Sequence, residues 1–115
     1  MFDFQKLKVY QKVKDFNKSI KSFIGQNSFD KFTNDQLRRA SFSILLNIAE
    51  GSSRFSNKDR RNFLIIARGS AFECVSILDY LLIVDEINQE EYQGYFMQLE
   101  EISKMLFALI KKFET

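Results

Sequence analysis

Residues 36–51 read QLRRASFSILLNIAEG, and this segment decides the fold. Two arginines are followed by ten residues without a charge, 40–49, which indicates a helix that lacks a charged stripe. A surface helix of a small domain normally keeps such a stripe toward water, and a helix without one is covered on every side. A chain of 115 residues offers little material for covering it, so we expect a second copy to cover part of this helix.

Apolar side chains recur at spacings of three and four residues on both sides of this segment, as in amphipathic helices. The chain has no proline and four glycines, which favours long uninterrupted helices because proline in a helix costs about 3 kcal/mol. The predicted helix boundaries are Asp3 to Gly25, Thr33 or Asn34 to about Ser52, Ser56 to about Val84, and Asn88 to Phe113. Short loops place successive helices antiparallel, so the prediction is a single all-α domain over residues 1–115, an up-down-up-down four-helix bundle.

Charge is distributed unevenly along the chain, although the net charge is only +2. Residues 1–70 hold 14 Lys and Arg against 6 Asp and Glu, whereas residues 71–115 hold 3 against 9. In the predicted bundle one end gathers Lys6, Lys8, Arg54, Lys58, Arg60, Arg61, Lys111 and Lys112. The opposite end gathers Asp30, Asp35, Asp85, Glu86, Glu90 and Glu91 against Lys31. We therefore expect a basic end and an acidic end.

Polar or small residues are embedded in the two most apolar helices, where they predict either an oligomer interface or a buried polar network. They are Arg38, Arg39, Ala40, Asn47, Glu50, Gly51, Arg68, Gly69, Ser70 and Glu73. Antiparallel packing about a turn near residue 54 places Arg39 beside Ser70 and within a turn of Glu73. The same register places Glu50 near Asp59 and Arg60. It also sets Gly69 opposite Ala40, which predicts a close approach of the two helices.

Catalysis and metal binding receive little support from the composition. The chain has no histidine, and its only thiol, Cys74, falls on an apolar stripe, where cysteine is usually a small hydrophobe. We expect no catalytic residue, no metal site, no cofactor and no enzyme activity. The chain opens without a charged-then-apolar leader, and no apolar run reaches the roughly 18 residues of a membrane span. We expect a cytoplasmic protein with no membrane partner.

The segment 54–61, RFSNKDRR, is the best candidate for function. Lys and Arg side chains and helix N-termini bind phosphates, and a helix is predicted to begin at Ser56. No base-reading motif accompanies it, so binding to RNA or DNA would be driven by the phosphate backbone. Basic residues at an exposed turn are also often only solvated, and that alternative stays open.

Four stretches together resemble a known family: FDFQKLKVYQK at 2–12, RRA and NIAEG within 38–51, RFSNKDRRNFLIIARGSAFE at 54–73, and LEEISKMLFALIK at 99–111. They resemble the small bacterial four-helix-bundle proteins first described from intervening sequences of 23S ribosomal RNA genes. The resemblance implies a homo-oligomeric ring, expected to be a pentamer. Similar bundles accompany reverse transcriptases, which implies a nucleic-acid or nucleic-acid-processing protein partner. The predicted function is a non-enzymatic oligomeric adaptor, and the alternative is a purely structural protein interaction module.

Overall fold

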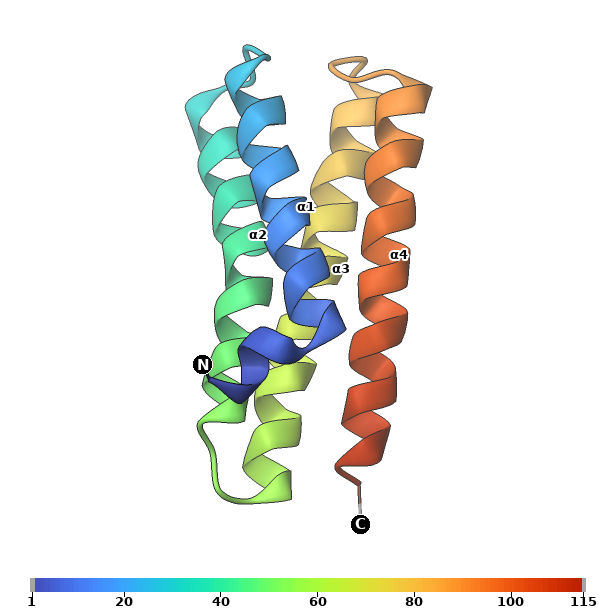
Figure 1. Cartoon of the computed structure of the whole chain (residues 1–115). Coiled ribbons are helices and arrows are strands. Elements are labelled where there is room, and N and C mark those ends of the chain that lie inside the picture. Colours follow the sequence, from blue (N-terminus) through green and yellow to red (C-terminus); the bar gives the residue numbers. More distant parts are fainter. Residues whose placement is uncertain (1, 115) are drawn as a thin grey trace.

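Residues 2–114 are described by a computed structural model and form four long helices and one short 3-10 helix. The elements are η1 (Asp3–Lys6), α1 (Lys8–Gly25), α2 (Lys31–Ser52), α3 (Asn57–Ile83) and α4 (Gln89–Lys112). No strand occurs among these residues. Successive long helices run in opposite directions, so the predicted all-α, up-down-up-down four-helix bundle is confirmed (Figure 1).

Side-chain caps define the starts of three helices. Ser56 accepts a hydrogen bond from the backbone N–H of Asp59 at 3.1 Å, and this confirms the predicted start of α3. Asn88 and Glu91 form a reciprocal capping box with bonds of 2.8 and 3.0 Å at the start of α4. Both starts were predictable because the capping residue and its partner three residues later satisfy backbone N–H groups that a helix leaves unpaired.

The start of α2 was predicted wrongly. The cap is Asp30, whose carboxylate accepts a hydrogen bond from the backbone N–H of Thr33 at 2.8 Å. Thr33 and Asn34, the predicted caps, therefore lie inside the first turn. Asp30 is as good a capping residue as either, so α2 gains a full turn at this end.

The start predicted for the first helix was also wrong, whereas its end at Gly25 is confirmed. Residues 3–6 form the separate η1, and α1 begins at Lys8 with Leu7 at its cap position. The backbone N–H of Phe2 donates to Gln5 Oε1 at 2.8 Å, which holds this tighter turn. Gly25 is the last residue of α1, and no glycine among the described residues has a positive φ.

The four helices share one apolar core, and α2 and α3 pack together most extensively. Ser43 Oγ and Ser70 Oγ lie 2.9 Å apart across this pair. Asn17 on α1 donates to the carbonyl oxygen of Ser41 on α2 at 2.8 Å, which joins α1 to the same side. These bonds satisfy polar groups close to the core, where an unpaired one would be costly.

Helix α1 is the shortest of the four, with 18 residues against 27 in α3. At 1.5 Å per residue it is about 13 Å shorter. Figure 1 shows η1 crossing below the start of α1 toward α2, with the N-terminus on the flank and the C-terminus at the bottom of the view. The end of the bundle that carries the α2–α3 turn is therefore closed by η1 in place of a fourth full-length helix.

Candidate assembly face and nucleic-acid interface

Eight large apolar side chains of α2 and α3 are exposed, and five of these, between residues 42 and 72, are here called the outer face. The five are Phe42, Leu46, Ile65, Ile66 and Phe72. Phe42 and Leu46 are 50% and 51% exposed, and the three α3 side chains are similar. Ser43 meets Ser70, so the next turn toward the α2–α3 connection brings the Leu46 and Ile66 positions level. Exposed apolar side chains of the two helices therefore lie next to each other, and Phe72 extends the outer face toward the groove between α3 and α4.

Residues 40–49 were expected to be covered on all sides. Within one copy, only the inner side of this segment is covered. Ala40, Ile44 and Ile48 are buried, while Phe42 and Leu46 face outward. Ala40 was predicted to belong to an oligomer interface or to a buried polar network, but it is 0% exposed and belongs to the apolar core of its own chain. A charge placed there would disrupt folding before it could disrupt assembly.

The predicted close approach at Gly69 was wrong. A Cβ built on Gly69 meets no described atom within 4 Å, and the residue points outward on α3 between the outer-face positions Ile65 and Phe72. The close approach occurs at Gly51, where a Cβ would lie 3.1 Å from Phe63 Cβ and 3.2 Å from the Arg60 carbonyl oxygen. Gly69 lies on the outward side of α3 and Ala40 on the core side of α2, so they do not face each other whatever the register.

The predicted ion pair between Arg39 and Glu73 is present. Arg39 donates to a carboxylate oxygen of Glu73 at 2.8 Å across the α2–α3 surface, with both side chains about half exposed. Glu50 does not meet Asp59 or Arg60 as predicted, because it pairs at 2.6 Å with Arg54, four residues later in the α2–α3 turn. These pairs lie at the border of the outer face, not in the interior.

Other polar residues of the predicted set occupy different surroundings. Asn47 donates to the Ser43 carbonyl oxygen at 2.9 Å. Arg38 is exposed. Arg68 lies between the rings of Phe72 and Phe107, 4.8 and 5.4 Å from their centroids. No ion pair involves Arg68 within residues 2–114, and its Nε is buried without a hydrogen-bond partner. The two aromatic rings therefore supply its main electrostatic stabilisation.

The predicted basic end contains three half-buried arginines whose contacts are structural. Arg54 pairs with Glu50 and lies over the ring of Phe63, 4.6 Å from its centroid. Arg60 Nε donates to the Arg54 carbonyl oxygen at 2.8 Å. Arg61 donates to the Phe113 carbonyl oxygen at 3.5 Å. These arginines join the turn to the ends of α3 and α4, so they are held in place by the fold.

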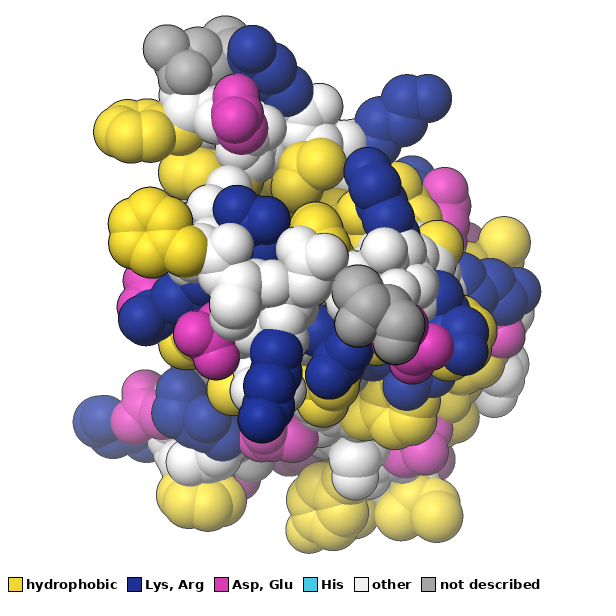
Figure 2. All heavy atoms as spheres, turned by 90° about the horizontal axis from the view of Figure 1, so that it is seen from below, with side chains coloured by type: hydrophobic (Ala, Val, Ile, Leu, Met, Phe, Trp, Pro, Cys, Tyr) yellow, Lys and Arg dark blue, Asp and Glu magenta, His cyan; other side chains and the backbone are white. Residues whose placement is uncertain are grey.

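The lysines of the basic end are more accessible. Lys6, Lys8, Lys58, Lys111 and Lys112 are all exposed, and Lys111 pairs with Glu114 at 3.1 Å. Figure 2 shows this end from below, with Lys and Arg side chains interspersed among hydrophobic and some acidic ones. The end is therefore basic but mixed, with exposed lysines at its edge.

A cavity of about 350 Å³ opens at the basic end beneath η1. Its floor is apolar and includes Ile48, Leu64 and Leu109. The lining also includes the aromatic residues Phe4 and Phe113 and the polar residues Asp3, Ser52, Arg60 and Lys112. The short α1 accounts for this cavity, because η1 alone covers the core there.

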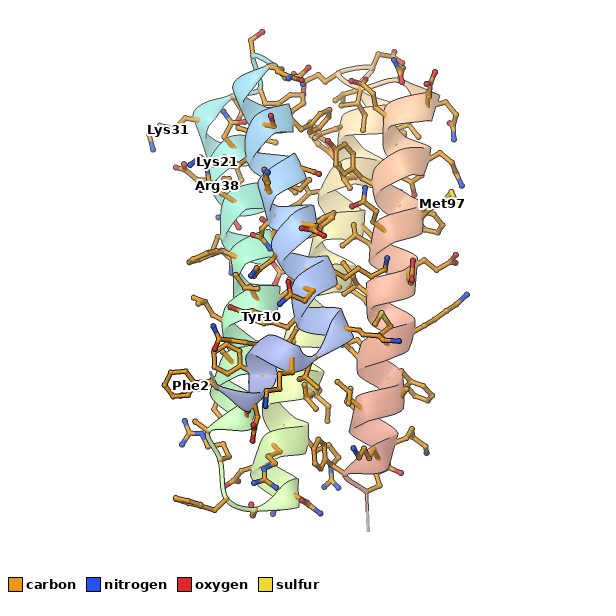
Figure 3. All side chains as sticks on the ribbon, in the orientation of Figure 1. Phe2, Tyr10, Lys21, Lys31, Arg38 and Met97 are labelled. Atoms are coloured by element: carbon orange, nitrogen blue, oxygen red, sulfur yellow. The ribbon has the colours of Figure 1, made fainter. Side chains whose placement is uncertain are left out.

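A second row of cations was missed by the sequence analysis. Lys14, Lys18 and Lys21 follow each other at spacings of four and three residues, so they share one side of α1, and all are exposed. Figure 3 shows Lys21, Lys31 and Arg38 on the same flank, toward the end predicted to be acidic. The spacing was readable in the sequence, and it makes the separation of charge along the bundle weaker than predicted.

Cys74 is buried, and burial raises the pKa of its thiol to about 12. It remains a thiol at neutral pH and fills space in the core. Residues 2–114 contain no group of three Cys, Asp or Glu side chains placed to hold a metal ion. Over the same range, no helix has both the length and the apolar character needed to cross a membrane.

Comparison with known proteins finds a family and a similar solved structure. The family described as 23S rRNA-intervening sequence protein matches residues 5–108. A crystal structure from Bacteroides thetaiotaomicron, described as a protein with unknown function from the S23 ribosomal protein family, is 29% identical, with a TM-score of 0.83. The match covers 90% of this chain and 98% of that one. No curated protein matches.

Proposed function

The chain belongs to the 23S rRNA-intervening sequence protein family, and we propose that it is a non-catalytic homo-oligomeric adaptor. In this proposal the outer face joins copies of the chain, and the basic end binds RNA, DNA or a protein that handles them. The observation that carries the proposal is the outer face, because it leaves large apolar side chains of two neighbouring helices exposed. Exposed patches of this kind mark interaction sites.

The energy available from the outer face suits an assembly. Complete burial of a large apolar side chain contributes about 1.5–3 kcal/mol, so burying the exposed half of each contributes about 1 kcal/mol. Five such side chains per copy therefore contribute several kcal/mol toward the cost of association. Phe42 lies on α2 and Phe72 on the outward side of α3, so the α2 side of one copy can meet the α3 side of the next. Such head-to-tail contacts close into rings, and the family resemblance favours five copies.

Assembly would strengthen a weak phosphate affinity at the basic end. Copies related by a ring axis present the same end on one rim, and simultaneous binding to one strand multiplies affinity by avidity. The exposed Lys6, Lys58 and Lys112 supply the phosphate contacts in this proposal, and the half-buried arginines hold the surface in shape. We infer binding with little sequence preference, since phosphate contacts position a protein without reading bases.

The test is a nucleic-acid titration with a charge-reversed basic end. A variant carrying Lys6→Glu, Lys58→Glu and Lys112→Glu should lose binding to an RNA oligonucleotide at low salt while its assembly mass stays unchanged. The matched control carries Lys14→Glu, Lys18→Glu and Lys21→Glu, which makes the same charge change on α1. Wild-type affinity should fall steeply with salt, by a slope of about −0.7 per phosphate contacted on a single strand.

Loss of binding only in the control variant would move the nucleic-acid surface to α1. Absence of any binding by the wild type at low salt would favour the alternative, a purely structural interaction module. One observation supports that alternative: Arg54 and Lys111 already pair with Glu50 and Glu114. Under it, the outer face still assembles the protein, and the charges serve only its solvation.

A further inference from the structure

The basic end carries two phenylalanine side chains that are largely exposed to solvent. Phe55, at the α2–α3 turn, is 97% exposed and stands between Arg54 and Lys58 in the sequence. Turns of this kind usually carry small polar residues. Phe2, next to η1, is 73% exposed and stacks on Phe4 with ring centroids 5.9 Å apart. Large apolar rings are thus displayed at the same end as the exposed lysines.

The cavity beneath η1 adds a half-open site with aromatic residues in its lining, near the same turn. Arg60 borders this cavity, lies 5.9 Å from the Phe113 ring centroid, and donates to the Arg54 carbonyl oxygen at 2.8 Å. One arginine therefore connects the cavity to the residue that precedes Phe55. The volume of about 350 Å³ is large enough for a planar heterocyclic base, and the lining offers it the aromatic rings of Phe4 and Phe113. Lys112 and Arg60 at the lining would face the attached phosphate.

We propose that the basic end recognises single-stranded nucleic acid, with one unpaired base stacked on Phe55 and another inserted into the cavity beneath η1. The proposal rests on the proposed function and specifies its ligand. Flat aromatic rings beside cations bind unpaired bases, because every base has an exposed π-face only when it is unstacked. In a duplex these faces are hidden, so Phe55 and the cavity contribute nothing to duplex binding. The charge pattern favours a polyanionic strand over an acidic peptide because the cations alternate with rings.

The decisive variant is Phe55→Ala, which changes no charge and removes a side chain that is almost fully exposed. Its matched control is Phe32→Ala, a phenylalanine that is 73% exposed at the opposite end of the bundle. The probe is a 12-nucleotide oligouridine, compared with a duplex RNA of equal length. Phe55→Ala should weaken oligouridine binding by about 5- to 150-fold, the usual effect of losing one base stack. Duplex binding and the Phe32→Ala variant should match the wild type.

The salt dependence separates stacking from charge. Phe55→Ala should leave the slope of log affinity against log salt unchanged, because no phosphate contact is lost. Lys58→Gln should reduce this slope. A third variant, Ser52→Trp, places a large ring at the cavity lining and should weaken oligouridine binding without changing the slope.

The outcomes distinguish this inference from the broader proposal. Equal binding of single strand and duplex, with Phe55→Ala and Ser52→Trp indistinguishable from wild type, would overturn the inference and leave the basic end a plain phosphate-binding surface. A change of assembly mass in Phe55→Ala would also overturn it, since the ring would then contact another copy. No binding of either probe by the wild type would overturn this inference together with the nucleic-acid part of the proposed function, and would leave the assembly through the outer face standing.

Discussion

Replacing Gly69 by alanine tests the outer face with the smallest possible change. Glycine in the interior of a helix costs about 1 kcal/mol relative to alanine. Within one copy no close contact requires a glycine at this position, because an added Cβ at Gly69 meets no described atom within 4 Å. Gly94 on α4 has equally open surroundings and serves as the matched control.

In isolated copies both substitutions should stabilise the fold. The gain is about 1 kcal/mol for each, or about 4 °C in Tm for a chain of this length. The measurement is denaturant unfolding in a Leu46→Glu background, in which a charge on the outer face keeps copies apart. Stability can then be read without the concentration dependence that assembly brings.

In the assembled protein the two substitutions should differ. If a neighbouring copy packs against Gly69, the added methyl group overfills the contact, at a cost of about 1–3 kcal/mol. Gly69→Ala should then weaken assembly by about 5- to 150-fold in dissociation constant, measured by dilution in sedimentation velocity, while Gly94→Ala should not. If both variants assemble like the wild type, Gly69 has no contact with another copy and this argument fails.

Three further predictions concern stability within one copy. Double-mutant cycles on Arg39 and Glu73 should return a coupling of about 0.2–1 kcal/mol, the range for exposed pairs, and additive effects would show that the pair contributes nothing. Gly51→Ala should destabilise the fold by about 1–3 kcal/mol in urea unfolding, since its Cβ would press on α3, and a stabilised variant would show that this contact relaxes easily. Tyr92 donates to Asp79 at 2.5 Å, and this bond is the main cause that raises the pKa of Tyr92 to about 12 from its usual 10.0. The folded state favours protonated Tyr92, so the stability that this bond contributes is complete below about pH 10 and is lost as pH rises through about 12. Asp79→Asn should flatten that part of the profile of unfolding free energy against pH. An unchanged profile would refute the assignment.

The four helices were predictable because their signals are local. Ser56, Asn88 and Glu91 bond within one turn of their own helix, so spacing alone identifies them. Asp30 stands three residues before Thr33 and carried the same kind of signal, which the prediction overlooked. The 3-10 turn at the N-terminus was not predictable from periodicity, because it is too short to show any.

The candidate site was predictable only in part, because it depends on register between helices. Arg39 and Glu73 were paired correctly, yet Gly69 and Ala40 were placed on the wrong sides of their helices. Register gives the height of a residue along the bundle but not the side of the helix on which it lies, and long side chains can still meet where small residues cannot. The cavity beneath η1 was not predictable, since it follows from the length of α1.

The measurement that tests the central claim most directly is the molar mass of the wild-type protein in solution. Light scattering coupled to size exclusion should give several times the subunit mass of 13.6 kDa at micromolar concentration. Leu46→Glu, which places a charge on the outer face, should return that mass toward a single subunit with the helical content unchanged. A wild-type protein that elutes at 13.6 kDa across this range would contradict the account, because the outer face would then face water in the functioning molecule.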